Sequence, residues 1–352
     1  MDLQELEELF EDDDEEIIYF LNNFRTYNVR ERKNYMLEFD ENEFSFRFRF
    51  PKNTVRQLVQ ELGPVLHHVN LMYHELDATA QVLITLRFYA TGSFYIVMGD
   101  FGGIHKTTAG RIIKRVTDAI VSLRPQYVKF PNIEDIDNVQ LSFYRFARFP
   151  KVIGAIDCTH IPIKSPGGNN AEFFRNRKGF FSLNVQVVCD ANNYIMDVVC
   201  RWPGSCHDSH IFNNSSLKTR FENGEFMDKV LLGDSGYPVL NYLMTPLQNP
   251  QRAAEVLYNE SHIASRIVIE RTFGLLKSRF PILTCGMRCK LPFIQRIITA
   301  CSVLHNIAII NREILVNEDA VDVDLEQVVA VHFHPGAIPV QRNFINYFET
   351  LL

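Results

Sequence analysis

Four acidic residues are the side chains of this sequence best suited to metal-dependent chemistry. Asp157 and Asp234 each end a short apolar run, Glu270 lies in a stretch with helical amphipathic spacing, and Asp208 follows the segment 202–207. Mg²⁺ and Mn²⁺ prefer oxygen ligands, and two such ions about 3.5–4 Å apart can stabilise both the attacking and the leaving oxygen of a phosphoryl transfer. Two strand-end aspartates followed by a helical glutamate therefore predict a two-metal site, and favour an enzyme that cuts or joins DNA.

The elements that must hold these acids are the ends of buried strands and one face of a packed helix. We expect strands at 152–157, 181–189, 194–200 and 229–234, and a helix at 263–280. Ligands on such rigid elements keep their geometry, which the reaction rate requires.

Each acid also has an ordinary structural interpretation. A strand-end aspartate often bonds nearby backbone N–H groups, and Glu270 with Arg266 could form a surface ion pair one helical turn apart. Against this, Ile267, Phe273 and Gly274 share the helix face of Glu270, which predicts that the glutamate projects from the apolar side.

Several motifs occur in a fixed order around the four acids. They read GAIDCTHI at 154–161, PGSCHDS at 203–209, LGDSGYP at 232–238 and IERTFGLLKSRF at 269–280, with NRKG at 176–179, a strand at 182–190 and CSVLHN at 301–306. Together they resemble the PIF/Harbinger transposases and the Harbinger transposase-derived nucleases, over roughly residues 45–312.

This resemblance implies an α/β fold, with an RNase H-like mixed-sheet catalytic core and a DDE metal site. Asp157, Asp234 and Glu270 then correspond to the catalytic triad, and Asp208 to a further acidic position associated with metal. In an RNase H-like sheet the second carboxylate follows the fourth strand, which favours Asp234, although Asp208 stays open as the alternative. The cofactor implied is a divalent cation, Mg²⁺ or Mn²⁺, with two ions expected.

Four segments are expected along the chain. They are a disordered acidic tail at 1–30, a helical region at 31–145, the RNase H-like DDE nuclease domain at 146–312 and a C-terminal tail at 313–352 with a short helix at 343–352. Helices are predicted at 55–69, 78–89 and 94–101, and 95–116 has a helix-turn-helix pattern with Gly103 at the turn. Thr107 or Thr108 would cap the second helix, whose inner face would carry Ile112, Ile113 and Val116.

The overall charge is not that of a typical DNA-binding protein. The net charge is −6, but residues 1–16 hold ten acids and no Lys or Arg, so the remainder is at +4. The second helix of the helix-turn-helix pattern would act as a recognition helix, or the two helices are a plain structural pair. The basic residues beside the acids would contact DNA phosphates, or they are an ordinary solvated basic face. The residues expected to bind DNA are Lys106, Thr107, Arg111, Lys114, Arg177, Lys178, Lys277 and Arg279.

Other function classes are disfavoured by the sequence. No apolar stretch approaches the roughly 20 residues that span a bilayer, and no signal peptide is expected. Cys285 and Cys289 are spaced as C-x₃-C without a second pair, which disfavours zinc. We find no Walker A motif, no dinucleotide-binding motif and no serine-hydrolase pattern.

The sequence therefore predicts a metal-dependent DNA endonuclease or transposase-like enzyme. A catalytically silent transposase relic that binds DNA or acts as an adaptor is the alternative, and an enzyme acting on RNA or another phosphodiester is a third. The resemblance implies a separate Myb/SANT-like DNA-binding partner, and we expect a nuclear protein that is also cytoplasmic and could form a homo-oligomer. No membrane association is expected.

Overall fold

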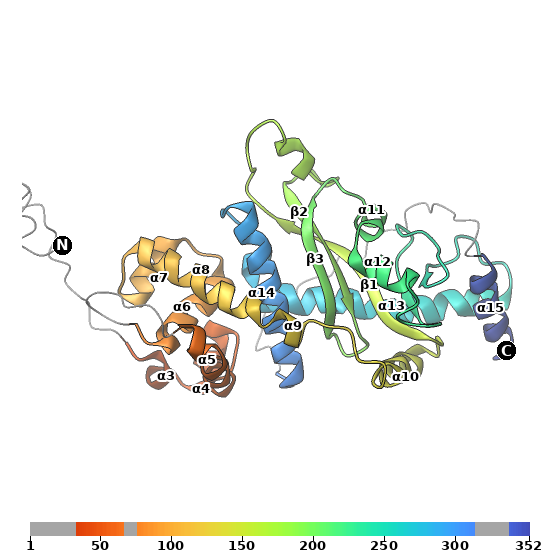
Figure 1. Ribbon diagram of the computed structural model, residues 1–352, viewed down its shortest axis with the longest axis horizontal. Helices are drawn as coiled ribbons and strands as arrows, with labels where there is room; N and C mark the ends of the chain where they lie inside the picture. The colour runs from red at the N-terminus through yellow and green to blue at the C-terminus, as the bar shows by residue number, and fades with distance from the viewer. Residues whose placement is uncertain (1–32, 67–75, 314–337) are drawn as a thin grey trace, which may run out of the picture. The chain divides into compact units, whose positions relative to one another are not determined.

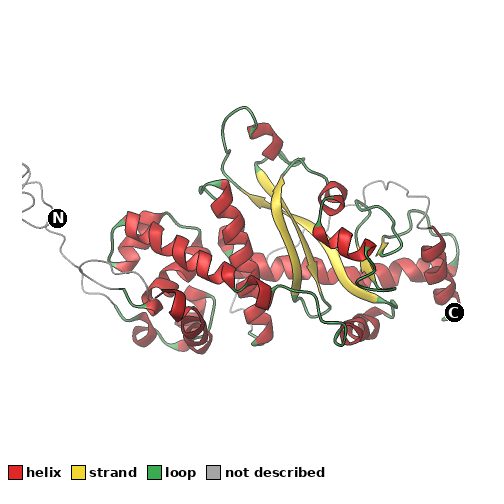
Figure 2. Ribbon diagram, in the orientation of Figure 1, coloured by secondary structure: helices red, strands yellow, loops and turns green. Residues whose placement is uncertain are grey.

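The computed structural model describes residues 33–66, 76–313 and 338–352. The acidic tail predicted at 1–30 lies outside these residues. The described chain combines helices with one five-stranded sheet (Figures 1 and 2).

The sheet is mixed, with the strand order β3-β2-β1-β4-β5. β1 pairs antiparallel with β2, which pairs antiparallel with β3, whereas β1, β4 and β5 run parallel. The strands are β1 (Val152–Pro162), β2 (Ser182–Cys189), β3 (Ile195–Pro203), β4 (Val230–Leu232) and β5 (Leu243–Met244). The predicted α/β class is confirmed, and the mixed sheet fits an RNase H-like core. β1 runs five residues further than expected, and the short β5 was missed.

β1 is the central strand of the sheet and is buried on both faces. Val152 and Ala155 belong to one hydrophobic core, and Ile153 and Ile156 belong to a second core on the opposite face. Such a strand reads as a continuous apolar run rather than an alternating one, as residues 152–156 do. The acid that follows this run is therefore held by packing on two sides.

Long helices cover the sheet. α13 packs against β1 and β2, α14 packs against β3, and α10 packs against β1 and α13. These and the other elements after residue 130 are α10 (Ile136–Ala147), η1 (Ala171–Phe174), α11 (Asp208–Asn213), α12 (Ser216–Glu222), α13 (Ala253–Arg279), η2 (Pro281–Leu283), α14 (Leu291–Ile310) and α15 (Ile338–Glu349). α13 starts ten residues before the predicted helix, and α15 starts before the helix expected at 343–352.

The region before the sheet is helical, as predicted. Its helices are α3 (Tyr35–Glu38), α4 (Glu41–Phe48), α5 (Lys52–Leu66), α6 (Ala78–Thr91), α7 (Tyr95–Gly102), α8 (Lys106–Ser122) and α9 (Arg124–Tyr127). α8 packs against α6, α7 and α14.

The helix-turn-helix pattern matches α7 and α8. Gly103 ends α7 in the left-handed conformation at φ 61°, where glycine carries no steric penalty. Ile112, Ile113 and Val116 are buried as expected. The predicted threonine cap is wrong, because His105 is the N-cap and its side chain accepts from the Thr107 N–H.

α14 corrects the expectation about apolar stretches. It is 20 residues long and apolar enough to cross a membrane by length and composition, and 72% of its apolar window is buried in the fold. A mostly buried helix of this kind is commonly the core helix of a soluble protein, so α14 is weak evidence for a membrane span.

The C-terminal half of α14 carries a buried polar clamp. Asn306 is fully buried, donates to the carbonyls of Tyr127 and Ile195 at 2.6 and 2.7 Å, and accepts from the Ile195 N–H at 2.8 Å. His305 donates from Nε2 to the Asn193 carbonyl at 2.8 Å. The string CSVLHN therefore ties α14 to the start of β3.

Substitution Asn306→Ala is expected to destabilise the fold by about 3 kcal/mol, because it removes the bonds of Asn306 to the Ile195 N–H and carbonyl. It also removes one of the two bonds accepted by the Tyr127 carbonyl, the other coming from the Tyr194 hydroxyl. Urea unfolding followed by circular dichroism measures the change. Asn138→Ala, on the exposed surface of α10, is the control and should change the free energy of unfolding little. Equal stabilities of the two variants would contradict the clamp.

Stability is also expected to fall in acid because of two buried histidines. Burial lowers the pKa of His262 and of His305 to about 4, from the value of 6.5 that is usual for a histidine side chain. The unfolded chain binds protons first, so stability decreases as the pH falls from about 6.5 to 4, on the order of 3 kcal/mol for each histidine. Urea unfolding at several pH values between 6.5 and 4 measures this decrease in the free energy of unfolding.

The variant His262→Gln/His305→Gln should show a flatter pH profile than the parent protein. His210→Gln, which changes an exposed histidine, should leave the profile unchanged. A double variant with the parental slope would show that these imidazoles do not cause the acid sensitivity.

Candidate metal centre

Three aspartates from distant parts of the sequence meet at one edge of the sheet. β1 and β4 are parallel neighbours with Ala155 opposite Leu232, and Asp157 and Asp234 each follow two residues later. The carboxylates of these two residues therefore reach the same edge. Asp208 arrives from the connection after β3, as the first residue of α11.

The three carboxylates are close enough to share a cation. One ligand oxygen from each of Asp157, Asp208 and Asp234 lies within 4.8 Å of the other two, and all three residues are partly exposed. No other group of this kind occurs among residues 33–66, 76–313 and 338–352. The structure thus brings together both candidates for the second carboxylate.

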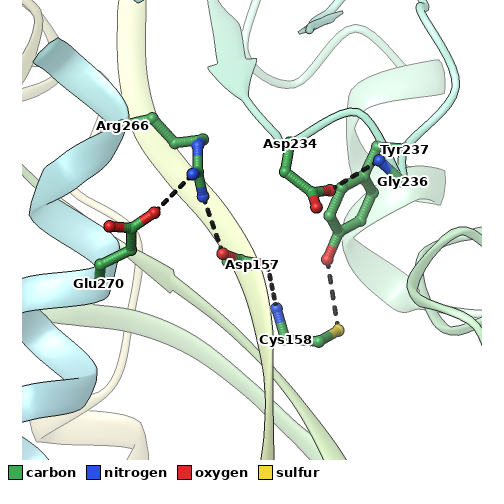
Figure 3. A network of polar contacts seen from close by, with 7 residues as sticks. All are labelled: Asp157, Cys158, Asp234, Gly236, Tyr237, Arg266 and Glu270. Carbon is green, nitrogen blue, oxygen red and sulfur yellow. Dashed lines mark hydrogen bonds and ion pairs between the residues drawn. The ribbon is translucent and has the colours of Figure 1, made fainter. Parts of the chain in front are cut away.

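Each aspartate is oriented by a hydrogen bond from its surroundings. Asp157 Oδ1 accepts from the Cys158 N–H at 2.7 Å, and Asp234 Oδ1 accepts from the Gly236 N–H at 2.9 Å (Figure 3). Asp208 Oδ1 accepts from the side chain of Asn184 at 2.8 Å. Asp234 makes the turn contact expected of a strand-end aspartate. Asp157 instead lies inside β1, so the expectation that it ends a strand is wrong, and its Oδ1 bonds the N–H of the next residue.

Glu270 lies on α13 on the other side of Asp157, and Arg266 stands between them (Figure 3). The Arg266 guanidinium donates from Nη1 to Asp157 Oδ2 at 2.9 Å and from Nη2 to Glu270 Oε1 at 2.5 Å. The side chains of all three are only 16–18% exposed. Glu270 is therefore tied to the aspartates through an arginine, rather than by direct proximity.

This arrangement revises two expectations for the helix. The pair Arg266–Glu270 forms, but it is mostly buried and includes Asp157, so it is not an ordinary surface ion pair. Ile267, expected on the apolar face beside Glu270, is 44% exposed, because the buried face of α13 runs through Val268, Ile269 and Thr272 instead.

The electrostatics of the site disfavour three free negative charges. Burial raises the pKa of Asp157 well above its usual range, and the charge of Asp234 raises it further, while Arg266 opposes the increase. Burial likewise raises the pKa of Tyr237, whose hydroxyl lies 3.3 Å from the Cys158 sulfur. An added cation would stabilise the ionised carboxylates.

The donor set fits a hard divalent cation. Three carboxylates offer oxygen ligands and three negative charges, which suits Mg²⁺ or Mn²⁺ better than a metal that prefers sulfur or nitrogen. Asn184 lies on β2 and bonds Asp208. Its side-chain amide also donates to the Cys206 carbonyl at 2.9 Å, which holds the segment before Asp208 in place.

Two important residues were missed by reasoning from the sequence. Arg266 was recognised as a helical neighbour of Glu270 and as a basic residue near the acids, but its bond to Asp157 was not expected. Asn184 gave no local signal, because its contact with Asp208 crosses 24 positions in the sequence.

The residues expected to bind DNA have different surroundings. Lys106, Thr107, Arg111 and Lys114 are exposed on α8, and Arg177 and Lys178 are exposed between β1 and β2. The Lys277 ammonium bonds Thr159 Oγ1 at 2.7 Å, beside the acids. Arg279 is 4% exposed, and its guanidinium bonds the Arg49 carbonyl and Glu313, so its burial does not fit a contact with DNA.

Comparison with known proteins agrees with this geometry. Residues 156–306 match the family described as DDE superfamily endonuclease. The human protein named "Putative nuclease HARBI1" is 39% identical over 267 residues, 74% of this chain and 76% of that protein. A Xenopus laevis protein of the same name is 32% identical over 293 residues, 82% of this chain and 84% of that protein.

A plant relative is more distant. "Protein ALP1-like" from Arabidopsis thaliana is 28% identical over 254 residues, 66% of this chain and 61% of that protein. No solved structure matches this chain.

The mixed sheet with acids at its edge is thus the core of a DDE superfamily endonuclease. Within that class, the chain belongs to the family of Harbinger transposase-derived nucleases. The resemblance seen in the sequence motifs is confirmed, and membership of this family implies the use of a divalent metal.

Arg266→Gln is expected to lower the free energy of unfolding without metal by about 3 kcal/mol, because Asp157 and Glu270 lose their buried counter-charge. Mn²⁺ should stabilise this variant more than the parent protein, because a cation then replaces the missing positive charge. Urea unfolding with EDTA and with Mn²⁺ measures both effects. Arg271→Gln, at an exposed position of the same helix, is the control.

A stability of Arg266→Gln in EDTA equal to that of the Arg271→Gln control would contradict the bridging role. An unchanged response to Mn²⁺ would show that Arg266 does not compete with a cation for these carboxylates.

Proposed function

We propose that this protein cleaves phosphodiester bonds of DNA by a two-metal DDE mechanism, with Mg²⁺ or Mn²⁺ as its cofactor. The observation that carries the proposal is the convergence of Asp157, Asp208 and Asp234, whose ligand oxygens lie within 4.8 Å of one another. The family gives DNA as the expected substrate.

In this proposal Asp157 and Asp234 are the principal metal ligands, and Asp208 is a further one held by Asn184. Divalent ions bound there supply Lewis-acid stabilisation of the phosphodiester oxygens. Glu270 completes the ligand set when the Arg266 guanidinium turns away from it. Arg266 then has its charge available for a nearby phosphate of the substrate.

The surrounding basic residues give the DNA a place to bind. Neutralising phosphates with Lys and Arg releases counterions and supplies affinity independent of sequence. We assign this role to the exposed α8 residues, to Arg177 and Lys178, and to Lys277. Strand transfer by a DNA 3′-hydroxyl would use the same site with a different nucleophile.

The partner and the location of the protein are part of the same proposal. A Myb/SANT-like DNA-binding protein would supply recognition of the target sequence and entry into the nucleus, and the chain would be found in the cytoplasm without it. Self-association is proposed because joining two DNA ends needs two active sites. Imaging of the tagged chain with and without such a partner, and light scattering, test these points.

Cleavage of end-labelled duplex DNA in the presence of Mg²⁺ or Mn²⁺ is the direct test. Asp157→Asn, Asp234→Asn and Glu270→Gln are each expected to reduce the cleavage rate by at least about a hundredfold, because they weaken binding of the cations whose positive charge stabilises the transition state. Glu260→Gln, at an exposed position of α13, is the matched control and should cleave like the parent protein.

The alternative is a catalytically silent protein that binds DNA or acts as an adaptor. It predicts no cleavage with either metal, with or without a Myb-like partner, and DNA binding by Asp157→Asn equal to that of the parent. That outcome would replace the nuclease proposal. Cleavage of RNA but not DNA would change the substrate and keep the site.

A further inference from the structure

The connection between β1 and β2, residues 163–181, presents aromatic side chains to solvent. Phe173 is 61% exposed and Phe180 is 37% exposed. The metal centre uses neither residue. Exposed single apolar residues are common, so the surroundings of Phe173 decide whether it has a role.

This connection is anchored at several points. Asn176 is 5% exposed and donates from its side chain to the Ser182 hydroxyl at 3.1 Å. Its N–H donates to the Phe180 carbonyl at 3.0 Å, and its side-chain Oδ1 accepts from the Phe180 N–H at 3.3 Å. The Arg175 guanidinium lies over the Phe181 ring, 4.4 Å from its centroid. Phe173 is therefore exposed on a segment that several contacts hold in place.

The segment is also joined to the part of the chain that carries Asp208. The Phe173 carbonyl accepts from the Ser205 N–H at 3.1 Å, three residues before Asp208. A Cβ at Gly204 would lie 2.7 Å from the Phe174 carbonyl oxygen, so this contact requires glycine. The position of Phe173 is thus coupled to that of the metal ligand.

The charge of this segment indicates a nucleic acid as the occupant. The segment has four basic residues, Lys164, Arg175, Arg177 and Lys178, against one acid, Glu172.

We propose that Phe173 stacks on an unpaired base of the substrate DNA, while Arg177 and Lys178 contact the flanking phosphates. The proposal rests on the nuclease function proposed above and names how that site holds its substrate. Stacking on an exposed aromatic ring is tolerant of sequence, since every base has a π face. Phe173 is then a positioning residue, because it does not touch the reacting atoms.

The test is binding, in EDTA, of two fluorescent duplexes, one fully paired and one with a single unpaired 2-aminopurine. The parent protein should bind the second more tightly and quench its 2-aminopurine. Phe173→Ala should lose about tenfold in affinity for the duplex with the unpaired base and lose the quenching, with little change for the paired duplex. Phe173→Trp should keep both properties.

Two controls separate stacking from other effects. Phe146→Ala removes a phenylalanine that is 56% exposed on α10 and should behave like the parent protein. Arg177→Ala should weaken binding of both duplexes equally and reduce the salt dependence, as expected for a phosphate contact.

Parental affinity and quenching in Phe173→Ala would overturn the proposal, and would leave a protein partner as the occupant of this surface. The result is distinguishable from a failure of the nuclease proposal. If Phe173→Ala loses the quenching, stacking is supported even when the parent protein does not cleave DNA. If the parent cleaves DNA and Phe173→Ala keeps the quenching, only the stacking proposal is rejected.

Discussion

Repulsion between carboxylates held close together in a half-buried site is the constraint on which this structure depends. One ligand oxygen from each of Asp157, Asp208 and Asp234 lies within 4.8 Å of the other two, and Glu270 bonds Arg266 beside them. Such a group is unfavourable without compensating positive charge. Arg266 supplies that charge to Asp157 and Glu270, and the rest of the site suits a divalent cation. The raised pKa of Asp157 has the same origin, since burial and Asp234 disfavour its ionised form.

The surrounding fold holds the carboxylates in place despite this repulsion. Two hydrophobic cores grip β1 from opposite faces, and the parallel pairing with β4 brings two aspartates to the same edge. Asn184 fixes Asp208, and the polar clamp on α14 fixes the start of β3, which leads toward it. Asn184, His305 and Asn306, which lie in the sequence motifs around the acids, thus have structural roles rather than chemical ones.

The molecule separates chemistry from the handling of DNA. Asp157 lies on β1, Asp234 just after β4, Asp208 at the start of α11 and Glu270 on α13. The exposed basic residues lie on α8 and on the connection between β1 and β2. Functional contacts carried by a rigid scaffold can vary in sequence without disturbing the catalytic geometry.

The sequence by itself determined the fold class, the main strands, the family and the four acids, because these depend on local periodicity and on motifs of contiguous residues. It also predicted the exposed face of α8. Only the tertiary structure decided that Asp208 joins Asp157 and Asp234, that Arg266 stands between Asp157 and Glu270, and that Arg279 is buried against Glu313. Each depends on contacts between segments far apart in the chain, which local patterns do not encode. β4, for example, has only three residues, and Asp234 is positioned by the pairing of β4 with β1. That pairing exists only in the folded chain.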